Sequence, residues 1–357
     1  MNRDQLLDAI RHGDPVRAQD LSHLDLDGAD LSGAMFEDVR FPKALRSALL
    51  KESTFITCDL GDCDASNADL HLATFYRSKL GRARFDRAKL VAASFVECAG
   101  GGASFAAVEA PIATWLKTSL RGASFAGANL DRANLLEIDA AEASFAGANL
   151  ENATLYRADL RTADLAGANL TLTTLVEAKL GPKSFAGTTL FRTQFMKSEL
   201  GGASFAGVDC PQCNFMGADL RGATFEDARG PQCFFGEARL QGATLARGDL
   251  RQAVFEKANL SNADLSGATL EEACFARAVA GEACFSGAKL READFSCADV
   301  SRADFSGAGL FRTRFHAAKR EGATLSAAAG WLGDDEALAR IEDWQPKHGA
   351  ETKGTER

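Results

Sequence analysis

The stretch between Ser119 and Leu180 decides the fold, because the same seven residues occur there twice. The segment Ser124-Phe125-Ala126-Gly127-Ala128-Asn129-Leu130 is repeated as Ser144-Phe145-Ala146-Gly147-Ala148-Asn149-Leu150. A Leu or Phe recurs every fifth residue, and a small residue precedes it by two positions. We call the Leu or Phe position i and number its neighbours from it. This period fits neither an α-helix, with about 3.6 residues per turn, nor a strand, which alternates every second residue.

The five-residue period continues far beyond this stretch in both directions. From Leu50 to Leu325 the central position falls on every multiple of five, and 46 of these 56 positions are Leu or Phe. No insertion breaks the frame. A fixed internal period of this kind indicates a solenoid, in which each unit buries its apolar side against its neighbours.

The repeated unit, Ala-(Asn/Asp/Ser/Thr)-(Leu/Phe)-x-x, resembles that of pentapeptide-repeat proteins over roughly residues 21–325. The resemblance implies an all-β solenoid, a right-handed quadrilateral β-helix in which four pentapeptides form one square coil. It also implies that residues i and i−2 point inward, whereas i−1, i+1 and i+2 face solvent. The ends of such a solenoid need caps, because they would otherwise expose unpaired backbone and core rings.

On this basis the chain divides into four segments. Residues 1–20 form an N-terminal helical cap with a helix over Asp4–His12, and residues 21–325 form the β-helix. Residues 326–345 form a C-terminal capping helix, spanning Trp331–Trp344 and entered through Asp334 and Asp335, and residues 346–357 are polar and disordered.

Local departures from the repeat predict irregular coils. The step from Phe41 to Leu45 is one residue short, so a kink or short loop is expected over residues 42–48. A bend or bulge is expected over residues 98–117, which combine three glycines with Trp115. The large side chains of Ile138 and Lys183 occupy i−2 positions and predict local distortion.

Phenylalanine and leucine occupy different walls of the predicted coil. From Phe55 onward every central Phe has a number ending in 5, whereas numbers ending in 0 carry Leu and never Phe. Large rings are therefore expected to face each other across the core. Six of the nine cysteines also take inward positions, where a thiol packs as a small apolar group: Cys58, Cys63, Cys98, Cys210, Cys213 and Cys233.

One outer column predicts a protein-interaction surface. At i+1, following one of the two Phe walls, apolar residues recur once in every coil: Ile56, Tyr76, Val96, Leu116, Leu136, Tyr156, Val176, Met196 and Met216. We call this column the ridge. Side chains about 4.8 Å apart over nine coils would form a strip of a few hundred Å², the size at which exposed apolar patches begin to indicate a contact. The ridge could also simply stack on itself or be covered by a terminal segment.

The neighbouring i+2 column alternates in charge and is called the charge ladder: Arg77, Glu97, Lys117, Glu137, Arg157, Glu177 and Lys197. Opposite charges stacked on adjacent strands are mildly favourable. The ladder could therefore fix the register of the coils, or it could flank the ridge and orient a partner.

The composition and the motifs disfavour catalysis. The chain has a formal charge of −9 and no apolar run approaching the ~20 residues of a transmembrane helix. Its first residues lack the apolar core of a signal peptide, so a cytoplasmic location is expected. The five histidines are scattered, no phosphate-cradling glycine loop occurs, and Cys210-Pro211-Gln212-Cys213 lacks a second ligand pair. We expect no enzyme activity, no cofactor and no metal site.

The chain is therefore interpreted as a scaffold or adaptor that binds a protein partner, a second copy of itself, or both, without direct contact with nucleic acid or membrane. The segment Leu24–Leu31 is similar to pentapeptide proteins that accompany bacterial type VI secretion components. The alternative is a DNA mimic that modulates DNA gyrase. A mimic needs one sign of charge along its length, whereas here an acidic region over residues 25–69 is followed by a basic belt over residues 77–89.

Overall fold

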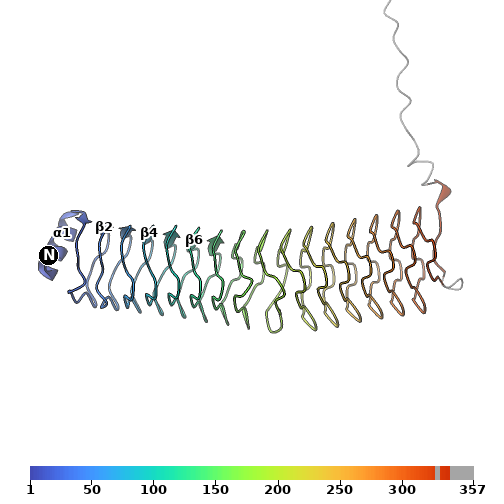
Figure 1. Cartoon of the computed structure of the whole chain (residues 1–357), viewed down its shortest axis with the longest axis horizontal. Helices are drawn as coiled ribbons and strands as arrows, with labels where there is room; N and C mark the ends of the chain where they lie inside the picture. Colours follow the sequence, from blue (N-terminus) through green and yellow to red (C-terminus); the bar gives the residue numbers. More distant parts are fainter. Residues whose placement is uncertain (326–329, 338–357) are drawn as a thin grey trace, which may run out of the picture.

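The computed structural model describes residues 1–325 and 330–337, and this part of the chain winds into a long rod with a helix at its N-terminal end (Figure 1). Helix α1 spans Arg3–His12, close to the predicted Asp4–His12. The Asn2 side chain accepts a hydrogen bond from the Gln5 N–H, and the Gln5 side chain accepts one from the Asn2 N–H, each at 2.9 Å. Leu6 is fully buried, so α1 covers the first coil as the predicted cap.

Seven short strands form a parallel sheet in chain order along one wall of the rod (Figure 1). They are β1 (Val16–Arg17), β2 (Met35–Glu37), β3 (Thr54–Ile56), β4 (Thr74–Tyr76), β5 (Ser94–Val96), β6 (Thr114–Leu116) and β7 (Asn134–Leu136). Because β1 already pairs with β2, the sheet begins inside the range predicted for the cap.

The pairing partners define the coil. Phe55 pairs with Phe75, and the other three walls carry single parallel bridges at i−1, for example Asp59 with Lys79. Each coil therefore offers four bridge positions, one on each of four walls, which confirms the predicted quadrilateral solenoid.

The corners between walls depend on two recurring features. The residue at i+2 adopts a positive φ even where it is not glycine, as at Arg82 (59°) and Asn152 (57°). An Asp at i−1 accepts a hydrogen bond from the backbone N–H at i+1, as Asp164 does from Ala166 at 2.9 Å. The repeated aspartates are thus explained by the turn.

Aromatic rings fill the core in two stacks. Phe125 lies parallel to Phe145 with ring centroids 5.0 Å apart, and Phe185 lies parallel to Phe205 at 4.4 Å. Across the core the rings meet edge to face, as Phe195 and Phe205 do at 5.9 Å and 81°. Both arrangements suit the aromatic quadrupole. The predicted separation of Phe and Leu walls is confirmed, and the six inward cysteines are buried.

The two expected irregular regions behave differently from the prediction. At residues 42–48 one corner of the coil is shorter by one residue. Met35 pairs with Thr54, so the separation of the pairing partners is one residue less than between Phe55 and Phe75. The bridges on both sides of the corner continue through Ala44. At residues 98–117 the expected bulge is absent, because Ala99, Ser104 and Glu109 keep bridges in register with both neighbouring coils. The space beside Gly100 is already filled, because a Cβ there would lie 3.2 Å from the Ser119 oxygen.

A genuine distortion lies at Lys183, as predicted. Its half-buried ammonium donates a hydrogen bond to the Ala163 carbonyl, and burial lowers the pKa of this amine. Within the described residues no bridge joins Asp164 to Ser184, although each is bridged to its other neighbour. One coil protrudes in this yellow-green part of the rod (Figure 1).

Ile138 does not distort its coil in this way, and that expectation was also wrong. Asp139, which follows it, keeps bridges to both neighbouring coils. The corner column that Ile138 occupies carries residues larger than alanine in the preceding coils: Cys58, Ser78, Cys98 and Thr118. The three-residue strands end with β7, which stops two residues before Ile138, and in the next coil Ala158 takes this corner. The strands of this wall therefore stop where alanine first enters the column.

The C-terminal end begins differently from the predicted helix. Trp331 packs edge to face on Phe315 at 5.7 Å, and Leu332 forms a parallel bridge with Arg314. Residues 331–335 therefore continue the solenoid, and helical residues begin only at 336, where Asp335 accepts a hydrogen bond from the Ala337 N–H at 3.0 Å. The rest of the predicted helix and the predicted disordered tail lie outside the described residues. No helix in the described ranges has the length and apolar character needed to cross a membrane.

Candidate protein-interaction surface

The nine ridge residues lie on one wall of the rod. The pairing of β3 to β7 places Ile56, Tyr76, Val96, Leu116 and Leu136 in direct register. Backbone hydrogen bonds donated from position i+2 continue the column: Glu137 donates to the Tyr156 carbonyl, Arg157 to Val176, Glu177 to Met196 and Lys197 to Met216. The structure therefore brings the whole ridge together.

The ridge is neither fully buried nor fully exposed. All nine residues are half-buried, and each lies in register with a residue of the coil before it and of the coil after it. The two tyrosines are also covered by the ladder. The Arg77 guanidinium lies 4.9 Å from the centre of the Tyr76 ring, and Arg157 lies 4.8 Å from that of Tyr156.

The charge ladder forms ion pairs at only some of its steps. Arg77 Nε lies 2.7 Å from Glu97, and Arg157 Nε lies 2.7 Å from Glu177. These contacts raise the pKa of both arginines, chiefly through the hydrogen bond to the carboxylate. Over residues 1–325 and 330–337, no ion pair joins the other three ladder charges to another side chain: Lys117, Glu137 and Lys197. These three charges are therefore left for other contacts.

On its other side the ridge is bordered by uncharged polar residues. The i−1 column of this wall reads Thr54, Thr74, Ser94, Thr114, Asn134, Thr154, Thr174, Gln194 and Asn214. These side chains are short or amide-bearing, and Asn214 Nδ2 donates to Gln194 Oε1 at 3.0 Å. The wall is thus a strip of three columns: polar, apolar and charged.

Sequence reasoning missed a second exposed apolar group. Leu72 and Ile112 are 46% and 50% exposed and lie two coils apart, with Ala92 between them. All three occupy i+2 positions with positive φ. The sequence could have predicted this group, because position i+2 more often carries glycine or a polar residue in this chain and an apolar residue there is unusual.

Some carboxylates of the acidic N-terminal region are paired with arginines of neighbouring coils. Arg46 binds Asp27 through two nitrogens, at 2.9 and 2.7 Å, and Arg82 binds Asp62 at 2.7 and 2.9 Å. In both cases this hydrogen bond is the main reason that the pKa of the aspartate is lowered. Paired carboxylates of this kind do not present the uniform negative surface that a DNA mimic requires.

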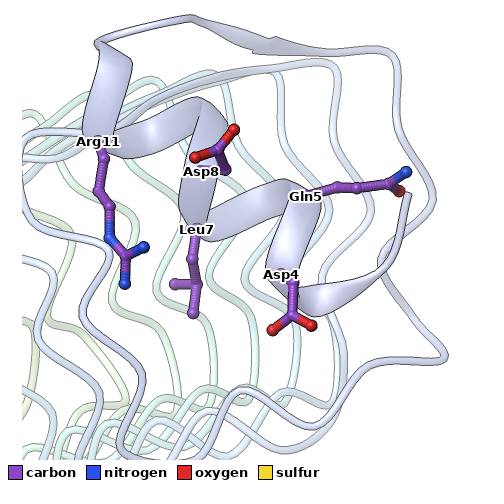
Figure 2. A pocket seen from close by; sticks show the side chains of 5 residues that line it. All are labelled: Asp4, Gln5, Leu7, Asp8 and Arg11. Atoms are coloured by element: carbon purple, nitrogen blue, oxygen red, sulfur yellow. The ribbon is translucent and has the colours of Figure 1, made fainter.

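Two features in the described part of the chain are candidate sites for a metal or ligand. No group of three or more His, Cys, Asp or Glu residues is arranged there to hold a metal ion. A hollow on α1 is lined by Asp4, Gln5, Leu7, Asp8 and Arg11, and Leu7 lies between Asp4 and Arg11 on one face of the helix (Figure 2). It is a surface feature of the cap. The Cys210 and Cys213 thiols are buried in the core, as predicted, and burial raises the pKa of Cys213.

A family comparison settles the kind of repeat. The family profile of pentapeptide repeats matches in eight copies, over residues 55–90, 118–161, 143–181, 194–229, 235–271 and 273–310. The chain belongs to the pentapeptide-repeat family. The matched segments contain seven of the nine ridge residues, and strand pairing gives the register of the other two, Val96 and Leu116.

Solved structures of similar proteins come from several sources. A trypsin-treated variant of QnrB1, a plasmid-mediated fluoroquinolone resistance protein, is 22% identical over 53% of this chain and 88% of its own, with a TM-score of 0.37. HetL, involved in heterocyst differentiation regulation in the cyanobacterium Nostoc sp. strain PCC 7120, is 27% identical over 70% of this chain and 88% of its own, with a TM-score of 0.21. At such TM-scores the alignments carry no functional argument. No curated protein sequence matches the chain.

Proposed function

We propose that this pentapeptide-repeat protein is a non-catalytic scaffold or adaptor that binds a protein partner through the ridge. The observation that carries the proposal is the placement of nine apolar side chains in one column on a single wall. A continuous apolar strip bordered by polar and charged columns has the composition of a protein-interaction surface, with an apolar centre and a polar rim.

The proposed function is tested by placing charge on the ridge. The variant Tyr76→Glu, Leu136→Glu, Met196→Glu introduces three carboxylates spaced along the column. Its matched control, Ala106→Glu, Ala166→Glu, Ala206→Glu, introduces the same charge at i+1 on the opposite Phe wall. Affinity capture should recover the partner with the wild type and the control, and lose it with the ridge variant. Equal recovery by all three proteins would refute the proposal.

We further propose that the protein is an accessory of a bacterial type VI secretion apparatus. This role is supported by the similarity of the segment Leu24–Leu31 to pentapeptide proteins that accompany such components. In the structure this segment is a regular part of the coil, with Leu26 and Leu31 buried and Asp25 bridged to Ala44. This role predicts that contractile-apparatus components are captured through the ridge. Capture of such components by the ridge variant as well would contradict it.

A cytoplasmic location is part of the same proposal. All nine cysteines are free thiols in the structure, which suits a reducing compartment. Because acidic residues such as Asp27 and Asp62 are paired with arginines, we also expect the protein to leave DNA gyrase supercoiling unchanged. Inhibition or protection of gyrase in that assay would favour the DNA-mimic alternative.

A further inference from the structure

The charge ladder has a property that selects its partner. Read from either end, its signs alternate at every coil. When two copies of this wall lie face to face and antiparallel, they are related by a twofold axis that runs across the wall. If this axis passes between two coils, ladder charges that face each other are opposite in sign. We propose that the ridge binds the ridge of a second copy of this chain, in an antiparallel dimer whose twofold axis passes between the coils of Glu137 and Arg157. This rests on the proposed function of the ridge and names its partner.

The apolar residues match in this arrangement. Each coil on one side of the axis faces the equivalent coil on the other, so Leu136 faces Tyr156 of the second copy and Leu116 faces Val176. Val96 then faces Met196, and Tyr76 faces Met216. Eight of the nine ridge residues meet another ridge residue. The ninth, Ile56, faces Gly236.

The unpaired ladder charges are the strongest support. Lys117, Glu137 and Lys197 have no ion pair within the described chain. In the dimer, Glu137 faces Arg157 of the second copy, Lys117 faces Glu177 and Lys197 faces Glu97. Every unpaired charge thereby meets the opposite charge on a residue that is already in an in-chain pair.

Other alignments of the same two walls are less favourable. A twofold axis through the coil of Glu137 would set like against like, because Lys117 would face Arg157 and Glu97 would face Glu177. A parallel dimer would set the ladder against the uncharged i−1 column and leave the charges unmatched.

Two competing axes lie one coil away: the one between the coils of Arg157 and Glu177 sets Glu97 against Glu237. The other lies between the coils of Lys117 and Glu137. It also pairs opposite charges, but it leaves Lys197 against Thr57. It further places the Glu37 carboxylate, which occupies the ridge column beside Ile56, against the apolar Met216. The proposed axis instead sets Arg77, which already pairs with Glu97, against Gly217, so that no unpaired ladder charge stays unmatched. At the next coil outside the contact it sets Glu37 against Glu256.

The size of the wall predicts a weak dimer. Eight coils about 4.8 Å apart and a wall of about four residues give a contact of about 40 by 12 Å, or ~500 Å² on each copy. The total of ~1,000 Å² is at the lower limit for a specific interface. Association should therefore be in the micromolar range and sensitive to salt, since the ladder is solvent-exposed.

The dimer proposal is tested by reversing the sign of every charge in the charge ladder. A chain with all seven signs reversed (Arg77→Glu, Glu97→Arg, Lys117→Glu, Glu137→Lys, Arg157→Glu, Glu177→Arg, Lys197→Glu) keeps the alternation within each chain. It should therefore fold and dimerise with itself. Mixed with the wild type it would oppose like charges at each of the six ladder positions that face another ladder residue. Co-purification of differently tagged chains should recover wild-type pairs and reversed pairs, and at least tenfold fewer mixed pairs. Mixed pairs in equal amounts would overturn the proposal.

A cross-linking experiment tests the position of the twofold axis. In a background of Cys274→Ser, Cys284→Ser and Cys297→Ser, cysteines at Thr114 and Thr174 should be joined between copies by a bismaleimide spanning about 10 Å, the separation of stacked sheets. The single variants Thr114→Cys and Thr174→Cys should stay monomeric on denaturing gels, and cross-linking equal to that of the double variant would overturn the proposed axis.

The two proposals fail separately. If mixed pairs form freely but the three-glutamate ridge variant still loses its partner, the dimer proposal fails and the scaffold function stands. If the ridge variant keeps every association, both fail.

Discussion

At the scale of single residues, Trp115 is a tryptophan at an inward position where the neighbouring coils of its wall carry Phe95 and Leu135. Its ring lies parallel to Phe95 at 5.2 Å and edge-on to Phe125 at 5.4 Å. The ring is fully buried, and its Nε1–H has no hydrogen-bond partner in the described part of the chain. The Trp115 ring thus keeps the stacking geometry of its neighbours, but its buried Nε1–H is left without a hydrogen bond in the described residues.

Replacing Trp115 with Phe should therefore leave the free energy of unfolding within about 1 kcal/mol of the wild type. The smaller ring leaves a cavity, but removing an unsatisfied donor returns about 1–3 kcal/mol. Trp115→Ala should cost about 3–5 kcal/mol, because the contacts with all three neighbouring rings are lost. Urea denaturation measures both values. A cost for Trp115→Phe as large as that for Trp115→Ala would contradict the explanation.

Ile112 is strained by its corner. It is a β-branched residue with φ of 54°, in the left-handed region that such residues avoid. The variant Ile112→Asn should raise the free energy of unfolding by about 1 kcal/mol, because Asn adopts this conformation more readily. The reciprocal variant, Gly122→Val, should lower it by about 1–2 kcal/mol, although nothing lies within 4 Å of the new Cβ. Thermal melts in which both variants shift the same way would refute this account.

At the scale of one coil, a corner can lose a residue without losing its walls. The short step between Phe41 and Leu45 leaves the bridges of Arg40 and Ala44 intact. The sequence indicated a kink there, but it could not show that one corner would take up the whole change. The missing residue lies in a turn, where no ladder hydrogen bond depends on it.

Inserting one glycine after Pro42 should therefore be tolerated, with a cost of no more than about 1 kcal/mol. The same insertion after Phe125 should be far more damaging, because a shift by one position moves every following inward side chain to the wrong face. Thermal unfolding followed by circular dichroism compares the two. Equal melting temperatures for the two insertions would contradict the proposed role of the corner.

Three buried thiols make the free energy of unfolding depend on pH in the alkaline range. Burial raises the pKa of Cys58 and Cys98 to about 11 and that of Cys63 to about 12, from 9.0. In the unfolded chain these thiols ionise near pH 9, whereas the folded chain keeps them neutral. Their contribution to stability is therefore complete below pH 9 and falls as the pH rises towards 11. Cys63→Ala should reduce the slope of the free energy of unfolding against pH over this range, and an unchanged slope would contradict the assignment.

At the scale of the whole molecule, the sequence was sufficient for the solenoid, the aromatic stacks and the N-terminal cap. Each follows from a local pattern, and the core pattern repeats with the coil, as Phe125 and Phe145 illustrate. The start of the C-terminal end was not predictable in this way, because Leu332 joins the sheet only when the coil of Arg314 is already in place. The half-burial of the ridge likewise depends on neighbours in the adjacent coils.

The candidate surface was predictable in position but not in detail. The repeat distance of one coil alone placed Tyr76 and Tyr156 on one wall. It could not show that Arg77 and Arg157 would cover these rings, or that Lys117 would lack an ion pair within the described residues, since these depend on side-chain geometry. The dimer proposal rests on those details.

The most direct test of the account is sedimentation equilibrium of the wild type, the ridge variant with Tyr76→Glu, Leu136→Glu and Met196→Glu, and the control with three glutamates on the opposite wall. The wild type and the control should show a concentration-dependent approach to twice the monomer mass at micromolar concentrations, and the ridge variant should remain a monomer. Equal masses for all three proteins at every concentration would contradict the claim that the ridge is the surface through which this protein associates.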